Sequence, residues 1–337
     1  MTKLRRIPCA GLAVALALGT SATAQDGPPE GLTGTIVVVN KQADNASFID
    51  LATGRIVATR PTGIGPHELV VSADGRTAVV TDYAGPGGNT LTVFDVASAR
   101  AVRTIDLGRF TRPHGISYMP DGETVAVTSE TTSTVIVVRV SDGQIIAEIP
   151  TDAQGSHMLA VTGDGETIWT GDIGSNTVTE LSLDGTRKVR AFSAPAQPEA
   201  VNVAPDGRRV FAGSNATGRV TAFDASDGSQ TVLGEGFGWP YRIFLTPGVE
   251  QIIVPDLSGE TLRFFDGDDY TELGSIDFPG EGPQGLILHP DGRHLFLSLS
   301  AAGRIAVVDI RTRAVVGYLP SGQGPDGIGY SALTVRR

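Results

Sequence analysis

The feature that most constrains this sequence is a phrase of ten residues that returns at near-regular intervals. In its fullest copy, Pro66 and His67 lead into a short apolar stretch that ends in an Asp-Gly turn at Gly75. The later copies begin at Pro113, Ser156, Pro198, Pro240, Pro283 and Pro325. Successive copies are 47, 43, 42, 42, 43 and 42 residues apart. A period of this length with four short apolar runs per unit is typical of a β-propeller blade.

Each interval between copies predicts four strands. In the second unit these strands cover residues 67–72, 77–82, 90–96 and 101–107, with polar or glycine-containing turns between them. Apolar residues alternate with a period near two, so no helix of ordinary length is expected. We therefore predict an all-β fold, a seven-bladed β-propeller with four-stranded blades, over residues 34–337.

The two ends of the repeat region complement each other. Three strands predicted near residues 35–60 have no preceding copy of the phrase, and the last copy, 325–335, has no strands after it. We expect this C-terminal strand to become the innermost strand of the first blade. Such closure joins the first blade to the last, and a single domain follows because blades bury their faces only against their neighbours.

The first 24 residues have the pattern of an export signal. A basic head at residues 3–6 precedes an apolar run at 10–19, and Ala22-Thr23-Ala24 matches a cleavage site. The apolar run is too short to span a bilayer. We expect cleavage after Ala24 and a periplasmic or secreted protein. Residues 25–33 are rich in proline and glycine and are predicted to be a flexible lead-in.

Composition excludes several classes of function. The single cysteine, Cys9, lies in the predicted signal, so the mature chain would have no disulfide, thiolate ligand, thiol nucleophile or c-type haem. Without the signal, 23 basic residues stand against 37 acidic ones, a net charge of −14. This charge argues against nucleic acid or an anionic membrane surface as a partner. A small molecule or a periplasmic protein remains, and we expect a monomer without a membrane span.

The repeat unit resembles that of the YVTN-type (YncE-like) seven-bladed propeller family. The likeness is carried by Pro66-His67, Ser72-Ala73-Asp74-Gly75 and Val79-Val80-Thr81-Asp82, and it extends over about residues 34–335. The resemblance implies the seven-bladed fold. It implies no single function, because propellers of this class serve as scaffolds, sensors, lactonases and oxidoreductase subunits.

One position of the repeat is predicted to gather polar side chains at one mouth of the channel. Strands alternate in direction within a blade, so the start of each innermost strand shares a face with the loop between the second and third strands. The seven residues at this position are His67, His114, His157, Glu199, Tyr241, Gln284 and Asp326. Because successive blades are related by rotation about the channel, these side chains should point toward a common axis.

Three of these residues are histidines on consecutive blades, and a glutamate follows on the next blade. His67, His114, His157 and Glu199 would offer three imidazoles and one carboxylate, a donor set that suits Zn²⁺, Cu²⁺ or Fe²⁺. The alternative is that the histidines bond neighbouring loops and hold the blades in register, or contact another ligand. The histidines are far apart in the sequence, so no local metal motif such as H-E-x-x-H supports the metal site.

Three acidic residues lie at or directly after the ends of the second strands of the histidine-bearing blades. Asp82, Glu130 and Asp172 could orient metal-bound imidazoles, as outer carboxylates commonly do. Alternatively, they tie down the ends of their own strands, a common use of aspartate at turns.

Three function classes remain open. The first is an exported binding or accessory propeller without turnover, which the resemblance favours. The second is a metal-dependent enzyme of the oxygenase or hydrolase type that uses the histidine site. The third is a metal-free lactonase or cycloisomerase, in which Glu199 or His157 is the general base and Arg242, beside Tyr241, clamps a substrate carboxylate. Metal content separates the second class from the others.

Overall fold

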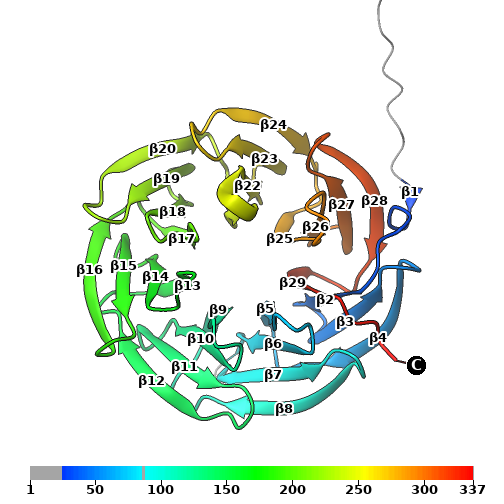
Figure 1. The fold of residues 1–337 in the computed structure, drawn as a ribbon, viewed down its shortest axis with the longest axis horizontal. Helices are drawn as coiled ribbons and strands as arrows, with labels where there is room; N and C mark the ends of the chain where they lie inside the picture. The colour runs from blue at the N-terminus through cyan, green and yellow to red at the C-terminus, as the bar shows by residue number, and fades with distance from the viewer. Residues whose placement is uncertain (1–24, 86–87, 337) are drawn as a thin grey trace, which may run out of the picture.

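The computed structural model describes residues 25–85 and 88–336, and the predicted signal at residues 1–24 lies outside them. Seven sheets, each with four antiparallel strands, stand around a central channel, as Figure 1 shows. The predicted all-β, seven-bladed propeller is confirmed. The helical content of the described residues is one 3-10 turn, η1 (Pro247–Val249). None of their helices is long and apolar enough to cross a membrane.

In every blade the strands are ordered from the channel to the rim. Blade 1 consists of β29 (Pro325–Ser331), β2 (Thr35–Asn40), β3 (Asn45–Asp50) and β4 (Arg55–Pro61). Blade 2 consists of β5 (Pro66–Val71), β6 (Thr77–Asp82), β7 (Thr90–Asp95) and β8 (Arg100–Asp106). Blade 3 consists of β9 (Pro113–Tyr118), β10 (Thr124–Ser129), β11 (Thr134–Arg139) and β12 (Ile145–Pro150). Blade 4 consists of β13 (Ser156–Val161), β14 (Thr167–Asp172), β15 (Thr177–Ser182) and β16 (Arg187–Ser193).

The remaining blades follow the same order, with one short inner strand. Blade 5 consists of β17 (Pro198–Val203), β18 (Arg209–Ser214), β19 (Arg219–Asp224) and β20 (Gln230–Glu235). Blade 6 consists of β21 (Phe244–Leu245), β22 (Gln251–Asp256), β23 (Thr261–Asp266) and β24 (Glu272–Asp277). Blade 7 consists of β25 (Pro283–Leu288), β26 (His294–Leu299), β27 (Arg304–Asp309) and β28 (Ala314–Pro320).

The C-terminal strand closes the ring. β29 pairs antiparallel with β2, so that Ser331 lies opposite Thr35 and Pro325 lies opposite Asn40. The predicted closure is confirmed. It makes blade 1 a composite of the two ends of the repeat region, and the first and last blades therefore cannot separate without breaking a sheet.

The lead-in at residues 25–33 is attached to the rim, although its composition predicts flexibility. A fifth strand, β1 (Gln25–Asp26), pairs in parallel with β28, and the Gly27 amide donates a 2.9 Å hydrogen bond to the Tyr318 carbonyl. Leu32 is buried in the apolar cluster between blades 7 and 1. A rim strand has unpaired backbone groups along its outer edge, and this segment pairs with them.

Seven apolar clusters lie between neighbouring blades in the described part of the chain. Middle strands such as β2 are buried along their whole length, because both faces of each sheet pack against a neighbouring blade. The innermost strands also approach each other closely. A Cβ on Gly327 would lie 2.6 Å from the His67 carbonyl oxygen, so glycine is required where β29 passes β5. This close approach brings the polar ring of the mouth together.

Candidate functional site

The ring position is turned toward the channel by a local irregularity of the innermost strands. His67 is the second residue of β5, and the pairing of β5 with β6 shifts register between Pro66 and Leu69. Equivalent shifts occur at the starts of the innermost strands of blades 1, 3, 4, 5 and 7. A bulge of this kind re-aims a side chain. It explains why a polar residue is accommodated at the start of an otherwise apolar strand.

The three histidines of the ring lie side by side and are buried. The ring centroids of His67 and His114 are 4.2 Å apart, and those of His114 and His157 are 3.4 Å apart. Tyr83 packs edge-on against His67 and His114, with centroid distances of 5.1 Å to each. The imidazoles thus form one cluster, with an aromatic wall on one side.

His114 is the central and most unusual member of this cluster. It is 0% exposed, and neither of its ring nitrogens has a hydrogen-bond partner among the described residues. Burial lowers its pKa well below the ordinary value, and the neighbouring His157 and His67 lower it further. His114 is therefore neutral, the form of imidazole that binds metals. Buried polar atoms are nearly always paired in proteins, so an imidazole without partners fits a ligand-binding role.

Glu68, which the sequence analysis did not identify, places a carboxylate next to His67 and His114. One donor atom each of His67, Glu68 and His114 lie within 4.8 Å of one another. Glu68 follows His67, at a position that is small or apolar in most blades and charged in two. The residues at this position are Glu68, Gly115, Met158, Ala200, Arg242, Gly285 and Gly327. Comparing the blades at this second position would have found Glu68.

Glu68 also forms an ion pair across the channel. Its carboxylate oxygen Oε1 contacts the Arg242 guanidinium and lies 3.6 Å from His67 Nδ1. The Arg242 side chain is buried, donates a 2.6 Å hydrogen bond to the Tyr241 carbonyl and lies 4.1 Å over the Tyr241 ring. Burial lowers the pKa of Arg242 to about 10, and the guanidinium stays protonated at neutral pH. Because Glu68 belongs to blade 2 and Arg242 to blade 6, this pair bridges the mouth.

His157 and Glu199, also predicted as metal ligands, are neighbours on the ring. His157 Nε2 is 3.6 Å from Glu199 Oε1, and His157 Nδ1 is 3.7 Å from Glu130 Oε1. Burial alone would lower the pKa of His157, but these two carboxylates raise it above its ordinary value. Burial also opposes ionisation of Glu130, yet His157, Tyr83 and Arg112 bring its pKa down to about 2. His157 is therefore the imidazole of the cluster that most favours a proton.

Asp326 is fully buried and holds His67 in place. Its carboxylate lies 2.7 Å from His67 Nδ1 and 3.5 Å from Lys41 Nζ, and it accepts a 3.0 Å hydrogen bond from the Tyr241 hydroxyl. Although burial opposes it, the charges of His67, Lys41 and Arg242 hold the pKa of Asp326 below its usual range. With Nδ1 facing this carboxylate, Nε2 is the His67 nitrogen left for a ligand. Gln284, the ring residue of blade 7, is half-buried.

Of the three acids predicted to orient imidazoles, Glu130 lies beside His157, whereas Asp82 and Asp172 bond within their own blades. Asp82 accepts hydrogen bonds from the Gly63 amide and the Thr90 and Thr92 hydroxyls. Asp172 accepts hydrogen bonds from hydroxyls of its own blade, including 2.7 Å from Ser156 and 2.6 Å from Thr179. These bonds tie the end of each second strand to neighbouring strands and, for Asp82, to the loop at Gly63. A short aspartate at the last strand residue reaches such neighbours, while the longer Glu130, one residue further on, reaches the ring.

Beneath the polar ring, the channel is mostly apolar. A cavity of about 390 Å³ has the Glu68–Arg242 pair among its lining residues. Its apolar lining includes Leu69, Ile116, Leu159, Val201, Leu286 and Ile328. The channel therefore offers an apolar space with one pair of opposite charges toward its mouth.

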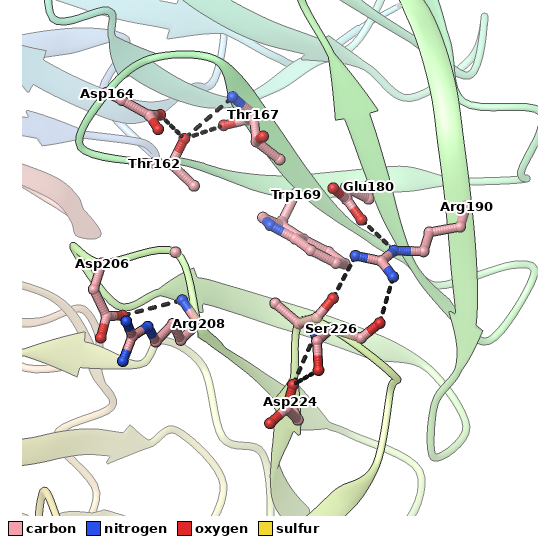
Figure 2. Close-up of a pocket in the computed structure, with 12 residues that line it drawn as sticks. Thr162, Asp164, Thr167, Trp169, Glu180, Arg190, Asp206, Arg208, Asp224 and Ser226 are labelled. Atoms are coloured by element: carbon pink, nitrogen blue, oxygen red, sulfur yellow. Dashed lines mark hydrogen bonds and ion pairs between the residues drawn. The ribbon is translucent and has the colours of Figure 1, made fainter.

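A larger cavity, of about 550 Å³, lies at the turns of blades 4 and 5. Most of its charged side chains form hydrogen bonds or ion pairs with neighbouring residues. Figure 2 shows Asp164 bonded to Thr162, and Arg190 bonded to Glu180. Asp224 likewise accepts a 2.5 Å hydrogen bond from the Ser226 hydroxyl. The mouth of the channel, with its unpartnered His114, is the stronger candidate site.

The fold and the mouth define a class of protein: a seven-bladed β-propeller with a ring of imidazoles and carboxylates at one end of its channel. Within that class, residues 16–121 match the family model of the YNCE-like beta-propeller. The resemblance of the repeats to YncE-like propellers is thereby confirmed.

Known proteins show the same architecture at low sequence identity. Hydrazine synthase subunit beta of Kuenenia stuttgartiensis is 26% identical over 157 residues, covering 39% of this chain and 41% of that subunit. The match thus spans less than half the length of that relative. A structure of hydrazine synthase from Kuenenia stuttgartiensis superimposes with a TM-score of 0.67 at 18% identity, over 80% of this chain and 90% of that one. A functionally unknown protein from Desulfotomaculum acetoxidans gives 0.73 at 17% identity, over 90% and 100%. At these identities the likeness to solved structures shows the fold alone.

Proposed function

We propose that this protein is an exported YncE-like propeller that binds a divalent transition metal ion at the histidine-lined mouth of its channel. The observation that carries the proposal is His114, a buried neutral imidazole with both nitrogens unpartnered among the described residues. Donor atoms of His67 and Glu68 lie within 4.8 Å of its own. Two imidazoles and a carboxylate suit Zn²⁺, Cu²⁺ or Fe²⁺. Export rests on the signal pattern of residues 1–24.

The remaining ring residues support the same site. Asp326 fixes the orientation of His67, as carboxylates commonly do for metal-bound histidines. His157 and Glu199 lie next to the set and are the further donors available to it. With only His67, Glu68 and His114 bound to the metal, a coordination position is left for water or a small molecule, which is the pattern of catalytic rather than structural zinc sites. A metal-dependent enzyme is therefore the second candidate.

A metal-free lactonase is less well supported, because its anion clamp is occupied. That function needs the Arg242 guanidinium for a substrate carboxylate. The guanidinium is held by Glu68, inside the protein. We therefore do not adopt this alternative.

The test is metal analysis of the mature protein, made by export to a bacterial periplasm without a histidine tag. The intact mass should correspond to a chain that begins at Gln25. After reconstitution with Zn²⁺ or Cu²⁺ and removal of excess metal, the wild type should retain about one ion per chain. His114→Ala should lose it, while His289→Ala, at the opposite end of the channel, should keep it. A wild type that retains no metal, or an unchanged content in folded His114→Ala, would refute the metal site.

A further inference from the structure

The Glu68 carboxylate cannot bind the proposed metal ion and Arg242 equally well. The same oxygen, Oε1, contacts the Arg242 guanidinium and lies 3.6 Å from His67 Nδ1. A metal ion held by His67, Glu68 and His114 would therefore lie close to Arg242. Two cations that share one carboxylate in a buried site repel each other strongly, because the local dielectric is low. Arg242 is thus an internal competitor of the metal for Glu68.

Once Glu68 binds a metal, Arg242 loses the carboxylate in direct contact with it, and Asp326, the nearby carboxylate, shares its charge with His67 and Lys41. The other nearby carboxylate, Asp326, is already engaged by His67, Lys41 and the Tyr241 hydroxyl. Arg242 keeps its hydrogen bond to the Tyr241 carbonyl and its stacking on the Tyr241 ring, but neither supplies negative charge. A buried guanidinium without an anion is costly. The geometry therefore calls for an external anion at this position.

The cavity beside Arg242 indicates what that anion carries. Arg242 and Glu68 line the 390 Å³ channel cavity, and most of the other lining side chains are aliphatic. A volume of this size suits a small molecule. Guanidinium groups bind carboxylates through two parallel hydrogen bonds. A carboxylate with a short aliphatic tail would satisfy both the charge and the apolar wall.

We propose that metal capture by Glu68 releases Arg242, and that the released guanidinium binds the carboxylate of a short aliphatic monocarboxylic acid whose tail lies in the channel. The inference rests on the proposed metal site and names its second ligand. Metal and acid then bind cooperatively. Each tightens the binding of the other by the same factor, since coupling between two sites is reciprocal.

The test is calorimetric titration of sodium octanoate into the metal-free and the Zn²⁺-loaded mature protein. Octanoate should bind the loaded protein at least about tenfold more tightly, and Zn²⁺ affinity should rise by the same factor when octanoate is present. In Arg242→Met, octanoate binding should be lost and Zn²⁺ should bind more tightly than in the wild type, because the competitor is gone. Arg242→Lys keeps the charge without the planar fork and should bind octanoate weakly.

The outcomes separate this inference from the metal site itself. Wild-type protein that binds Zn²⁺ with no coupling to octanoate refutes the inference and leaves the metal site standing. If octanoate still binds to Arg242→Met, its carboxylate binds the metal and not Arg242. That result also refutes the inference. Looser Zn²⁺ binding in that variant shows Arg242 to be a support of Glu68 rather than its competitor. If Arg242→Met does not fold, the reciprocal titrations of Zn²⁺ and octanoate into the wild type decide whether the two ligands are coupled. A wild type that does not bind Zn²⁺ refutes both the metal site and the carboxylate site.

Discussion

Asp326→Asn isolates the role of the buried carboxylate that orients His67. The substitution keeps the size of the side chain and an oxygen to accept the Tyr241 hydrogen bond. It removes the charge that faces His67 Nδ1 at 2.7 Å and Lys41 at 3.5 Å. An amide that turns its NH₂ toward Nδ1 favours the tautomer with its proton on Nε2. That proton occupies the nitrogen needed for a metal ion, so metal affinity should fall.

The size of the effect follows from the contacts that are lost. Loss of a carboxylate behind a metal-bound histidine typically costs 10- to 100-fold in metal affinity, or about 1.4–2.7 kcal/mol. A polar contact to a charged carboxylate contributes up to about 1.5–3 kcal/mol to folding. Burying an amide costs less than burying a carboxylate, which offsets part of that loss. We therefore expect stability to fall by about 1–2 kcal/mol, with the propeller still folded.

The assay is competition for Zn²⁺ against a chromophoric chelator, with urea unfolding of the same samples. Asp309→Asn is the matched control. Asp309 is also a buried aspartate in an ion pair, 2.6 Å from Arg293, but lies at the far end of blade 7. It should lose comparable stability and keep the wild-type Zn²⁺ affinity. Equal Zn²⁺ affinity in Asp326→Asn and the wild type would refute the orienting role of Asp326.

Two further predictions concern stability. Burial raises the pKa of Asp82 to about 6, so the folded state binds more protons than the unfolded state between about pH 4 and 6, and stability from this group falls as pH rises through that window. In urea titrations the advantage of the wild type over Asp82→Asn should shrink by up to about 3 kcal/mol from pH 4 to pH 7, and a pH-independent difference would contradict this cause. Thr128→Val should lose about 1–3 kcal/mol, because the Thr128 hydroxyl accepts a hydrogen bond from the Gly115 amide and donates one to the His157 carbonyl. Thr221→Val is the control, since that hydroxyl is buried without a partner among the described residues; an equal loss in both variants would show that packing rather than hydrogen bonding is responsible.

Much of the architecture could be predicted from sequence because a propeller is built from local signals repeated at a fixed interval. The Asp-Gly turns and the alternating apolar residues specify each blade separately. Ring closure could be predicted because the first blade lacked an innermost strand and the last copy of the repeat phrase lacked outer strands. The pairing of β29 with β2 confirms it. The attachment of β1 to β28 carried no such signal. It depends on which rim edge lies beside the segment, and the segment's own composition does not reveal that edge.

For the candidate site, too, the sequence determined one part and the tertiary structure another. The sequence by itself determined that His67, His114 and His157 occupy equivalent positions on neighbouring blades, because the repeat assigns them there, but it did not single out Glu68. Only the tertiary structure decided how they pair. Contacts across the hub join residues as far apart in the chain as Glu68 and Arg242, which are 174 positions apart. No local pattern encodes such a contact, because it depends on the radius of the closed ring, and that radius exists only once all seven blades have packed together.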